Sequence, residues 1–486
     1  MAVIHWFRCD LRLHDNPALI AAAHHSTGAV LPMFILDDAL LTSSRMSAAR
    51  IVFLLESLRA LDAALRDCGS RLVVRHGQPR NVLAACSASS GVDAVFFNRD
   101  YTPFARQRDD AVVAMLRERG VATYTFQDRV MCEPQTLLTK KATPYTMYAP
   151  YQRQWHGRVA ETRDAWSTGS RVSHLAPVPE AVVSAPIPEA GDLGHATTQT
   201  LMTGGEAEGR THLQRFVRAS NANGMRTYAT QRDLLEHTTT ARLSPYLHFG
   251  CLSPAVCIRA AHATVDSDPA AQAGAERWLG ELAWRDFYIQ ILFHFPHVLH
   301  GAFKEQMNEL EWDNHHEQFA AWCAGQTGYP IVDAAMRQLN SEGWLPNRAR
   351  LIAASFLVKN LLVDWRWGER IFLQRLVDGD LAANNGNWQW IASTGTDAQP
   401  FFRMFSPISQ SEKADPQGAY IRRYIPELHS LPTTYLHAPW TAPARVQQEA
   451  GIYFGRDYPA PIVDHTTQRN RTLAMYRRVV KKQHDS

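Results

Sequence analysis

The stretch Val3-Ile4-His5-Trp6-Phe7-Arg8-Cys9-Asp10-Leu11-Arg12-Leu13-His14-Asp15-Asn16-Pro17 decides the fold of the first part of the chain. Its apolar start, Val3 to Phe7, is typical of a buried strand, and a polar turn follows. Asp15 and Asn16 are good helix caps, and Pro17 suits the first turn of a helix. Together these residues predict the opening of an alternating α/β domain.

The same alternation continues along the chain. Further β-rich runs are Val30 to Leu36, Arg71 to Arg75, Ala94 to Asn98 and Ala122 to Gln127, and helical patterns cover Ala48 to Arg66 and Ala105 to Arg119. Short β-rich runs separated by helices predict a doubly wound parallel sheet with helices on both faces. Neither G-x-G-x-x-G nor G-x-x-x-x-G-K-[ST] occurs, so this domain lacks both common phosphate-binding loops.

The second half has a helical pattern. Residues 167–209 are rich in Pro, Ala, Thr and Gly, which indicates a linker or long surface connection. From about Thr211 onward strand signals are rare. Helices are expected over Ala275 to Phe293, Ile331 to Leu339, Asn347 to Leu362, Glu369 to Leu376 and Thr466 to Lys482. We therefore predict an α/β domain over residues 1–130, an interdomain connection over 131–209 and an all-α domain over 210–486.

Composition sets wide limits on function. The 486 residues are 45% hydrophobic and 20% charged with a net charge of +3, which neither requires nor excludes a nucleic-acid partner. The seven cysteines are scattered, which favours reduced thiols and no metal site. The apolar start is too short for a signal peptide, and no stretch is long enough to span a membrane. We therefore expect a cytoplasmic protein with no membrane partner.

Two runs in the second half combine carboxylates with aromatic residues. In Trp278 to Tyr288, helical spacing puts Glu281 near one face with aromatic side chains, where a carboxylate needs a partner; a buried polar ligand would supply one. The run Asp378 to Trp390 holds two aspartates, three asparagines and two tryptophans. A helix end capped by Asn385-Gly386 would explain part of this run. A functional site would explain the rest.

A third run, Gly343 to Leu351, contains a helix start. Pro346 breaks the chain, and Asn347 can cap the helix that follows. The simpler interpretation is a capped surface helix with solvated arginines. The alternative is a helix N-terminus that contacts a phosphate or another ligand.

Four segments resemble the photolyase/cryptochrome family. Trp6 to Asn16 resembles its opening strand and turn, Arg242 to Gly250 its flavin-phosphate segment, and Thr327 to Arg337 with Asp378 to Trp390 its flavin-domain signatures. The resemblance covers nearly the whole chain in the same order. It implies that the all-α domain binds FAD.

The resemblance also implies which residues would bind and reduce FAD. The phosphates and ribityl chain would contact Tyr228, Thr240, Leu243 and Ser244, and the flavin and its sugar would contact Asp378 and Asp380. Arg350 would pair with Asp378, and its charge would stabilise the anionic reduced flavin. Asn384 would face the reactive central nitrogen of the flavin. Trp388, Trp365 and Trp312 would relay electrons from the surface, although core packing is the simpler interpretation of each indole.

The activity implied is that of a deoxyribodipyrimidine photo-lyase, the light-driven repair of cyclobutane pyrimidine dimers by electron transfer from excited reduced FAD to a flipped lesion. Glu281 would hydrogen-bond the pyrimidine edge, and Trp284 and Trp390 would stack on the dimer. Asn347 and Arg348 would complete the pocket. The DNA phosphates would contact Arg232, Arg348, Arg403 and Lys413.

Ultraviolet-damaged DNA is thus the expected partner of a monomer without an obligate protein partner. Members of the family often carry an antenna chromophore, methenyltetrahydrofolate or 8-hydroxydeazaflavin, but Asn98 to Arg106 lacks the Asn-Glu pair of known folate binders. A cryptochrome-type blue-light photoreceptor is disfavoured because the chain ends soon after Lys482. A (6-4) photolyase would carry a histidine where this chain has Asn347. Another FAD oxidoreductase would need a nicotinamide site, and a pure DNA-binding module would not need the acid, amide and indole cluster.

Overall fold

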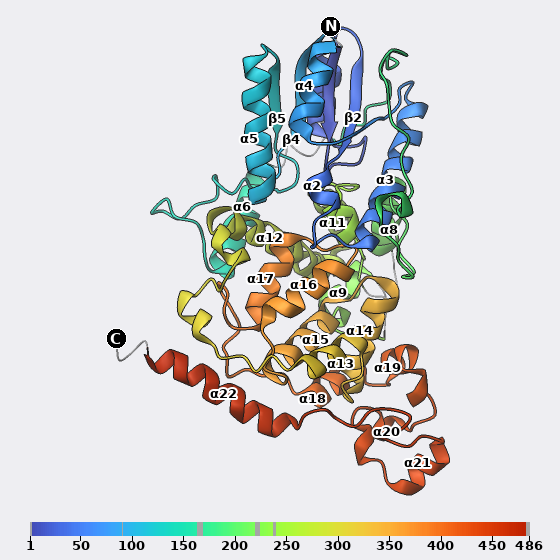
Figure 1. Ribbon diagram of the computed structural model, residues 1–486, viewed down its shortest axis with the longest axis vertical. Coiled ribbons are helices and arrows are strands. Elements are labelled where there is room, and N and C mark those ends of the chain that lie inside the picture. Colours follow the sequence, from blue (N-terminus) through green and yellow to red (C-terminus); the bar gives the residue numbers. More distant parts are fainter. Residues whose placement is uncertain (1, 90, 163–168, 219–223, 237–239, 483–486) are drawn as a thin grey trace.

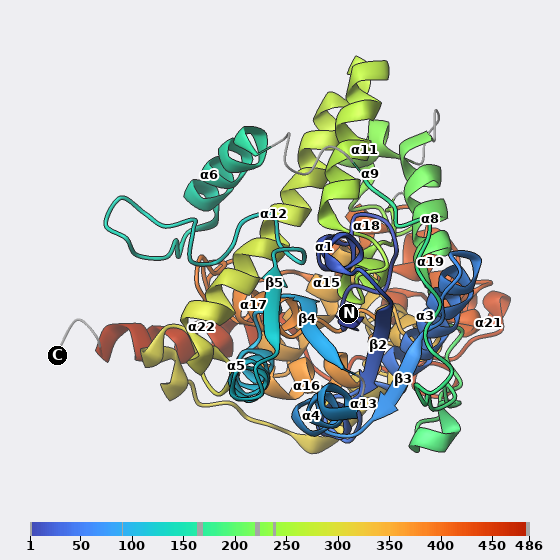
Figure 2. The ribbon, with the colours of Figure 1, turned by 90° about the horizontal axis from the view of Figure 1, so that it is seen from above.

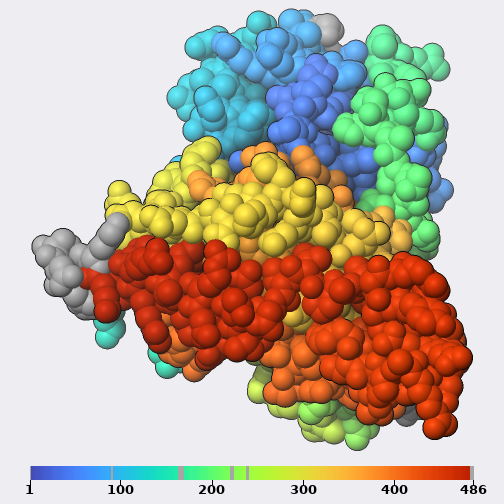
Figure 3. Space-filling view, turned by 60° about the horizontal axis from the view of Figure 1, so that its bottom comes forward, coloured from blue at the N-terminus to red at the C-terminus, as the bar shows by residue number. Residues whose placement is uncertain are grey.

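The computed structural model describes residues 2–89, 91–162, 169–218, 224–236 and 240–482. The α/β part lies at one end of the molecule and the helical part at the other (Figure 1). The last segments of the chain, drawn in red, cover the face of the helical part that is turned away from the sheet (Figure 3).

The α/β part is built on one five-stranded sheet of order β3-β2-β1-β4-β5. Its strands are β1 (Ala2–Phe7), β2 (Val30–Leu36), β3 (Val73–His76), β4 (Val92–Asn98) and β5 (Ala122–Phe126). All neighbouring strands pair in parallel, which confirms the predicted fold class. Two strand starts differ from the prediction by two residues: β4 begins at Val92 instead of Ala94, and β3 begins at Val73 instead of Arg71, where its pairing with β2 starts opposite Met33.

Helices cover both faces of this sheet, as predicted. Successive residues of a strand point to opposite faces. Val3 and Phe7 therefore pack in one core cluster with α1 (Pro17–His25) and α3 (Ala48–Asp67). Ile4 and Trp6 pack in another with α4 (Pro79–Ser89) and α5 (Pro103–Glu118). Figure 2 shows the sheet along its edge between the two layers.

The predicted start of α1 is confirmed. Asn16 is the N-cap, its side-chain oxygen accepts a hydrogen bond from the Leu19 amide at 3.1 Å, and Pro17 is the first helical residue. A short helix, α2 (Asp38–Leu41), follows β2.

The interdomain connection contains a helix that the sequence reasoning missed, α6 (Tyr148–Glu161). Its buried residues Tyr151, Trp155 and Val159 recur every four positions, and α6 packs against α12 (Gln272–His294). The described part of the predicted linker also packs on the α/β part, where the Ala185 amide donates to the Val74 carbonyl at 2.9 Å. The described part of the connection therefore packs against both the helical part and the α/β part. Its limits at residues 131 and 209 stay a prediction.

The helical part follows, and its described residues contain no further strand. Its remaining helices are α8 (Glu206–Arg218), α9 (Tyr228–Gln231), α10 (Ser244–His248), α11 (Pro254–Ser267), α13 (His316–Ala324), α14 (Pro330–Glu342), α15 (Asn347–Lys359), α16 (Trp365–Arg375), α17 (Leu381–Ile391), α18 (Pro407–Ala414), α19 (Ala419–Tyr424), α20 (Thr433–Leu436), α21 (Ala444–Ala450) and α22 (His465–Lys482). α15 ends at Lys359, earlier than predicted, and Leu362 beyond it has a φ of 53° that no helix accommodates.

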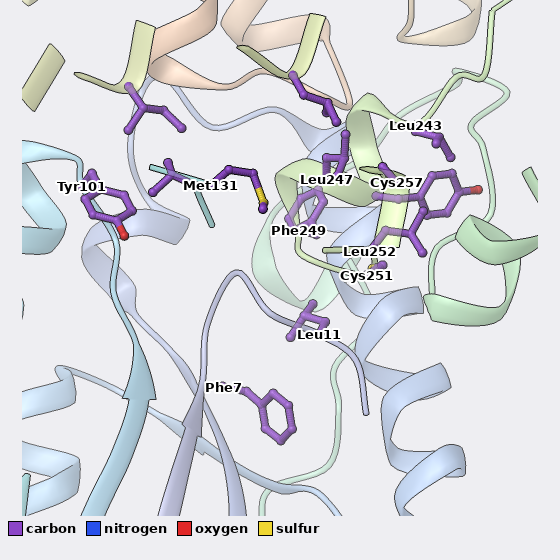
Figure 4. Packing of buried hydrophobic residues seen from close by; sticks show 14 of the residues in the cluster. Phe7, Leu11, Tyr101, Met131, Leu243, Leu247, Phe249, Cys251, Leu252 and Cys257 are labelled. Carbon is purple, nitrogen blue, oxygen red and sulfur yellow. The ribbon is translucent and has the colours of Figure 1, made fainter. Parts of the chain in front are cut away.

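The two parts share one core. Phe7 and Leu11 of the α/β part belong to the same buried cluster as Leu243, Leu247 and Phe249 of the helical part (Figure 4). Gly250 permits the close approach of these two segments, because a Cβ there would lie 2.0 Å from the Cys9 carbonyl oxygen. Side chains of the α/β part can therefore reach sites in the helical part.

Candidate active site

A cavity of about 300 Å³ opens in the helical part between α9, α10, α12, α15 and α17. It brings together eleven residues that the sequence predicted for the site. They are Tyr228, Thr240, Leu243, Ser244, Glu281, Asn347, Arg350, Asp378, Asp380, Asn384 and Trp388. Its volume and largely apolar lining are typical of a small-molecule or cofactor site.

The start of α15 places two of these residues. Pro346, not Asn347, is the N-cap, and no side chain caps the helix. The expected capping role of Asn347 is therefore wrong, and its amide lines the cavity instead. Arg350, one turn further, donates to the Leu345 carbonyl at 2.9 Å and to Asp378 Oδ2 at 2.7 Å.

Asp378 leaves a polar atom unsatisfied at the cavity. Its side chain is 2% exposed, Oδ2 accepts from Arg350, and Oδ1 is buried without a hydrogen-bond partner in the described structure. Buried polar atoms nearly always have a partner. An unpaired carboxylate oxygen that lines a cavity therefore indicates a polar ligand there.

Asp380 and Gly386 show why α17 lies where it does. Asp380 is the N-cap, and its Oδ1 accepts from the Ala383 amide at 2.9 Å. Asn385-Gly386 lies inside α17 and does not form a helix end, so that interpretation is wrong. A Cβ at Gly386 would lie 2.0 Å from the Tyr288 ring, so the glycine lets α12 and α17 pack closely.

The lining residues missed as site residues include four with polar side-chain atoms, Arg242, His248, Arg285 and Trp344. Arg242 lies 4.5 Å from the Trp344 ring, and the Trp344 indole donates to Ser244 Oγ at 3.2 Å. Burial lowers the pKa of the Arg285 guanidinium, whose neighbour Arg129 adds to this effect. The signal for Arg285 was its place four residues after Glu281, on the same helical face.

Asn384 and Trp388 lie on α17. The Asn384 amide donates to the Glu369 carbonyl at 3.0 Å, which fixes its orientation at the cavity. The Trp388 indole lies against Gly368, where a Cβ would be 2.1 Å away, and 5.0 Å from the Phe372 ring.

The other two tryptophans of the expected relay lie outside the cavity lining. Trp365 is buried in the same core cluster as Trp388. Trp312 is half-buried at the border of that cluster and lies 6.4 Å from Tyr476 of α22. The relay itself stays a prediction.

Glu281 has a protein partner, because Arg232 donates to its Oε1. The expectation that a ligand must supply this partner is therefore wrong for the free protein. Trp284 and Trp390, the expected lesion walls, are half-buried and do not line the cavity. Trp284 stacks on Tyr148 at 3.5 Å with an interplanar angle of 8°.

The four predicted DNA-contacting cations differ in their surroundings. Arg232 pairs with Glu281, and Arg348 pairs with Asp233 at 2.8 Å. Arg403 and Lys413 are exposed, and within the described residues neither has an ion-pair partner. The last two are thus the more available for phosphates.

The α/β part has a crevice at the carboxyl ends of β1, β4 and β5, where open parallel sheets usually bind ligands. Its free volume is only about 10 Å³. Ion pairs fill it, among them Arg8 with Asp109 at 2.5 Å and Arg129 with Asp100 at 3.1 Å. The crevice therefore gives no support to either antenna candidate.

The described residues hold no cluster of His, Cys, Asp and Glu that could bind a metal, and their cysteines are all unpaired thiols. None of the described helices has the length and apolarity that crossing a membrane requires.

The residues present fit FAD. Arg242, Arg285 and Arg350 offer cations for phosphates and for an anionic ring, and Asp378 Oδ1 offers an acceptor that the protein leaves unused. Trp278 and Trp344 add flat apolar surface.

Comparison with known proteins agrees with the site. The family model described as "FAD binding domain of DNA photolyase" matches residues 278–478, and the model "DNA photolyase" matches residues 3–170. The deoxyribodipyrimidine photo-lyases of Agrobacterium fabrum and Escherichia coli are each 38% identical to this chain, over 99% and 97% of it and 98% and 97% of their own lengths.

Solved structures of similar proteins share the whole fold. A bacterial class III photolyase from Agrobacterium tumefaciens superposes with a TM-score of 0.90 at 37% identity over 99% of this chain and 98% of that one. A Synechocystis cryptochrome reaches 0.86 at 28% identity over 98% and 99%. An archaeal photolyase from Sulfolobus tokodaii with two FAD molecules reaches 0.79 at 32% over 98% and 100%. The chain therefore belongs to the DNA photolyase family, and its helical part is the FAD-binding domain of that family.

Proposed function

We propose that this protein is a deoxyribodipyrimidine photo-lyase that repairs cyclobutane pyrimidine dimers in ultraviolet-damaged DNA under light. One observation carries the proposal: the Asp378–Arg350 pair and Asn384, expected at the flavin, line the same cavity as Glu281 and Asn347, expected at the lesion. Relatives at 38% identity over nearly the full chain carry this name.

The protein's own groups would bind and orient the flavin. Bound reduced FAD supplies a light-excited electron to the lesion. Arg350 would place positive charge beside the flavin ring, where it stabilises negative charge most in a site shielded from water. Asn384, held by the Glu369 carbonyl, would present a neutral amide that can donate or accept.

Glu281 would have two partners in turn. In the free protein the Arg232 guanidinium donates to its Oε1. When DNA binds, a phosphate would draw the Arg232 guanidinium away, and the Glu281 carboxylate would accept hydrogen bonds from the pyrimidine edge. Trp284, already stacked on Tyr148, would offer its remaining aromatic surface to the flipped bases, opposite Trp390.

A cryptochrome-type photoreceptor is the second candidate, because a Synechocystis cryptochrome shares the fold with a TM-score of 0.86. A repair assay distinguishes the two functions, because only a photolyase removes the lesion in light. A (6-4) photolyase is the third candidate, and Asn347 at the cavity argues for the cyclobutane dimer.

The test uses the FAD-loaded, reduced protein with oligonucleotides that carry either lesion, under blue light and in the dark. We expect loss of cyclobutane dimers in light only and no loss of (6-4) photoproducts. If neither lesion is lost under blue light, the result would favour the photoreceptor. E281Q should retain FAD and lose most repair, whereas E427Q, which changes an acid of the surface pair with Arg337, should repair normally.

We also propose an antenna chromophore, methenyltetrahydrofolate or 8-hydroxydeazaflavin. The support is a relative, the Sulfolobus tokodaii photolyase, whose structure contains two FAD molecules and is described as implying a novel light-harvesting cofactor. Chromatography of the pigments released from the purified protein distinguishes a pterin, a deazaflavin and a second flavin.

A further inference from the structure

Two arginines of the α/β part reach into the helical part and hold the turn Asp378-Gly379-Asp380 at the cavity. Arg129 follows β5, and its guanidinium lies between Asp100 of the α/β part at 3.1 Å and Asp380 at 2.8 Å. Its side chain is only 8% exposed. Arg129 therefore forms a buried bridge from the sheet to a carboxylate that lines the cavity.

Arg50, in the first turn of α3, holds the backbone of the same turn. It donates to the Gly379 carbonyl at 3.1 Å and to the Leu373 carbonyl at 2.7 Å. A Cβ at Gly379 would lie 3.4 Å from the Arg50 Nε, so the guanidinium packs directly on the turn. Both contacts join segments more than 300 residues apart in the chain.

The charges around Asp380 show what Arg129 contributes. Burial by itself would raise the pKa of Asp380, but His248, 3.7 Å away, and Arg129 together lower it below its ordinary range. Burial also lowers the pKa of His248, so this imidazole is charged less readily near neutral pH, whereas Arg129 is a permanent cation on the carboxylate.

Other groups act on Asp380 less directly. Arg285 and Arg50 add attraction at longer range, the Ala383 amide occupies Oδ1, and the Asp100 carboxylate lies across Arg129. Only Arg129 among the described side chains combines a hydrogen bond with a full charge at Oδ2. Its bond to Asp100 fixes the guanidinium from the other side.

We propose that Arg129 is a positioning residue of the flavin site, through which the α/β domain holds the Asp380 carboxylate in the orientation that the cofactor requires, while Arg50 fixes the backbone of the turn. This inference rests on the proposed binding of FAD in the cavity. It assigns the α/β domain a direct part in flavin binding, beyond any antenna, and makes the Asp378–Asp380 turn dependent on both domains.

The experiment measures the release of FAD from the holoenzyme after dilution, by the rise in flavin fluorescence, at about pH 7. In R129Q the Asp380 carboxylate loses the hydrogen bond that joins it to the α/β part. The carboxylate is then no longer held in the orientation that the cofactor requires. R129Q should therefore release FAD about ten-fold faster than wild type, the effect of losing one hydrogen bond to a charged group.

Two variants serve as controls. R8Q removes another buried arginine of the same crevice, but Arg8 pairs with Asp109 and the Asn98 carbonyl, all within the α/β part. R8Q should match wild type in FAD release, even if it lowers the unfolding temperature as much as R129Q does. In the D380N background, R129Q should add no further increase in FAD release, because the carboxylate that Arg129 orients is gone.

R129K separates charge from geometry. Lysine supplies the cation but not the two-sided bridge, so R129K should release FAD a few-fold faster than wild type and more slowly than R129Q. If R129Q does not fold, R129K carries the test, and wild-type release rates in R129K would overturn the inference. Wild-type release from R129Q, an added effect of R129Q in the D380N background, or equal effects in R8Q would also overturn it.

The inference and the proposed function fail in different ways. Wild-type protein that binds FAD but repairs no dimer in light refutes the function and leaves the role of Arg129 in FAD retention testable. If the wild-type protein repairs dimers but R129Q releases FAD at the same rate as R8Q, the inference is refuted and the proposed function is not.

Discussion

Replacing Arg350 by glutamine tests whether the buried Asp378 carboxylate depends on its cation. The Asp378 side chain is 2% exposed, the Arg350 side chain is 25% exposed, and their hydrogen bond measures 2.7 Å. Removing one partner of a fully buried pair costs about 3–5 kcal/mol, because the remaining charge is left without compensation. The partial exposure of Arg350, and the nearby Arg50 charge, reduce the expected loss to about 2–3 kcal/mol of unfolding free energy.

Arg337 provides a matched control. It forms a two-pronged pair with Glu427, at 2.8 and 2.9 Å, but that carboxylate is 36% exposed and lies on the surface. R337Q should therefore lose no more than about 1 kcal/mol. In the double variant R350Q/D378N the buried charge is gone, so stability should recover by more than half of the R350Q loss.

The assay is urea unfolding in a fixed excess of FAD, followed by helical circular dichroism. FAD affinity is measured separately for each variant, so that the contribution of ligand binding to stability can be subtracted. Equal losses in R350Q and R337Q would refute the reasoning, and so would a double variant that is less stable than R350Q.

Three further outcomes follow from the same structure. W388F should slow photoreduction of oxidised flavin at least about ten-fold yet spare repair by chemically reduced protein, while W440F should leave both photoreduction and repair unchanged; equal photoreduction in wild type, W388F and W440F would refute the relay. Burial lowers the pKa of Lys359 to about 7, below its value in the unfolded chain, so native protein gains stability as pH rises above 7 and loses it on acidification. K359M should abolish this dependence of stability on pH, so it should stabilise the protein by about 2–3 kcal/mol more at pH 6 than at pH 9. Parallel plots of stability against pH for wild type and K359M would count against this prediction. R403A and K413A should weaken binding to damaged and undamaged DNA alike and reduce its salt dependence, and a loss confined to damaged DNA would exclude simple phosphate contact.

Local pattern predicted the α/β part well. The alternation of apolar strands with helices, and the cap at Asn16, depend on neighbours in the chain, so β1 and α1 lie where expected. α6 was missed because its buried residues Tyr151 and Trp155 are separated by polar and charged ones in a segment that precedes a Pro-rich connection. Its signal, a four-residue recurrence of aromatic residues, was present in the sequence.

The site was predicted through resemblance more than through pattern. The Arg350–Asp378 pair was expected on that ground, and the structure brings the two side chains together. Partners from distant segments left no local signal: Arg232 is 49 residues from Glu281, and Arg129 is 251 residues from Asp380. Only the folded chain shows that these carboxylates are already paired, which changes what a ligand must supply.

The most direct test of a reduced flavin beside a bound lesion is the fluorescence of reduced FAD in the holoenzyme as oligonucleotide is added. Electron transfer to a dimer in contact with the flavin competes with emission, so an oligonucleotide with one cyclobutane dimer should quench the fluorescence, and E281Q should weaken that quenching. Undamaged oligonucleotide at the same occupancy should leave the emission unchanged. Equal emission with both oligonucleotides, at saturation confirmed by a binding assay, would contradict the placement of the lesion next to this cavity.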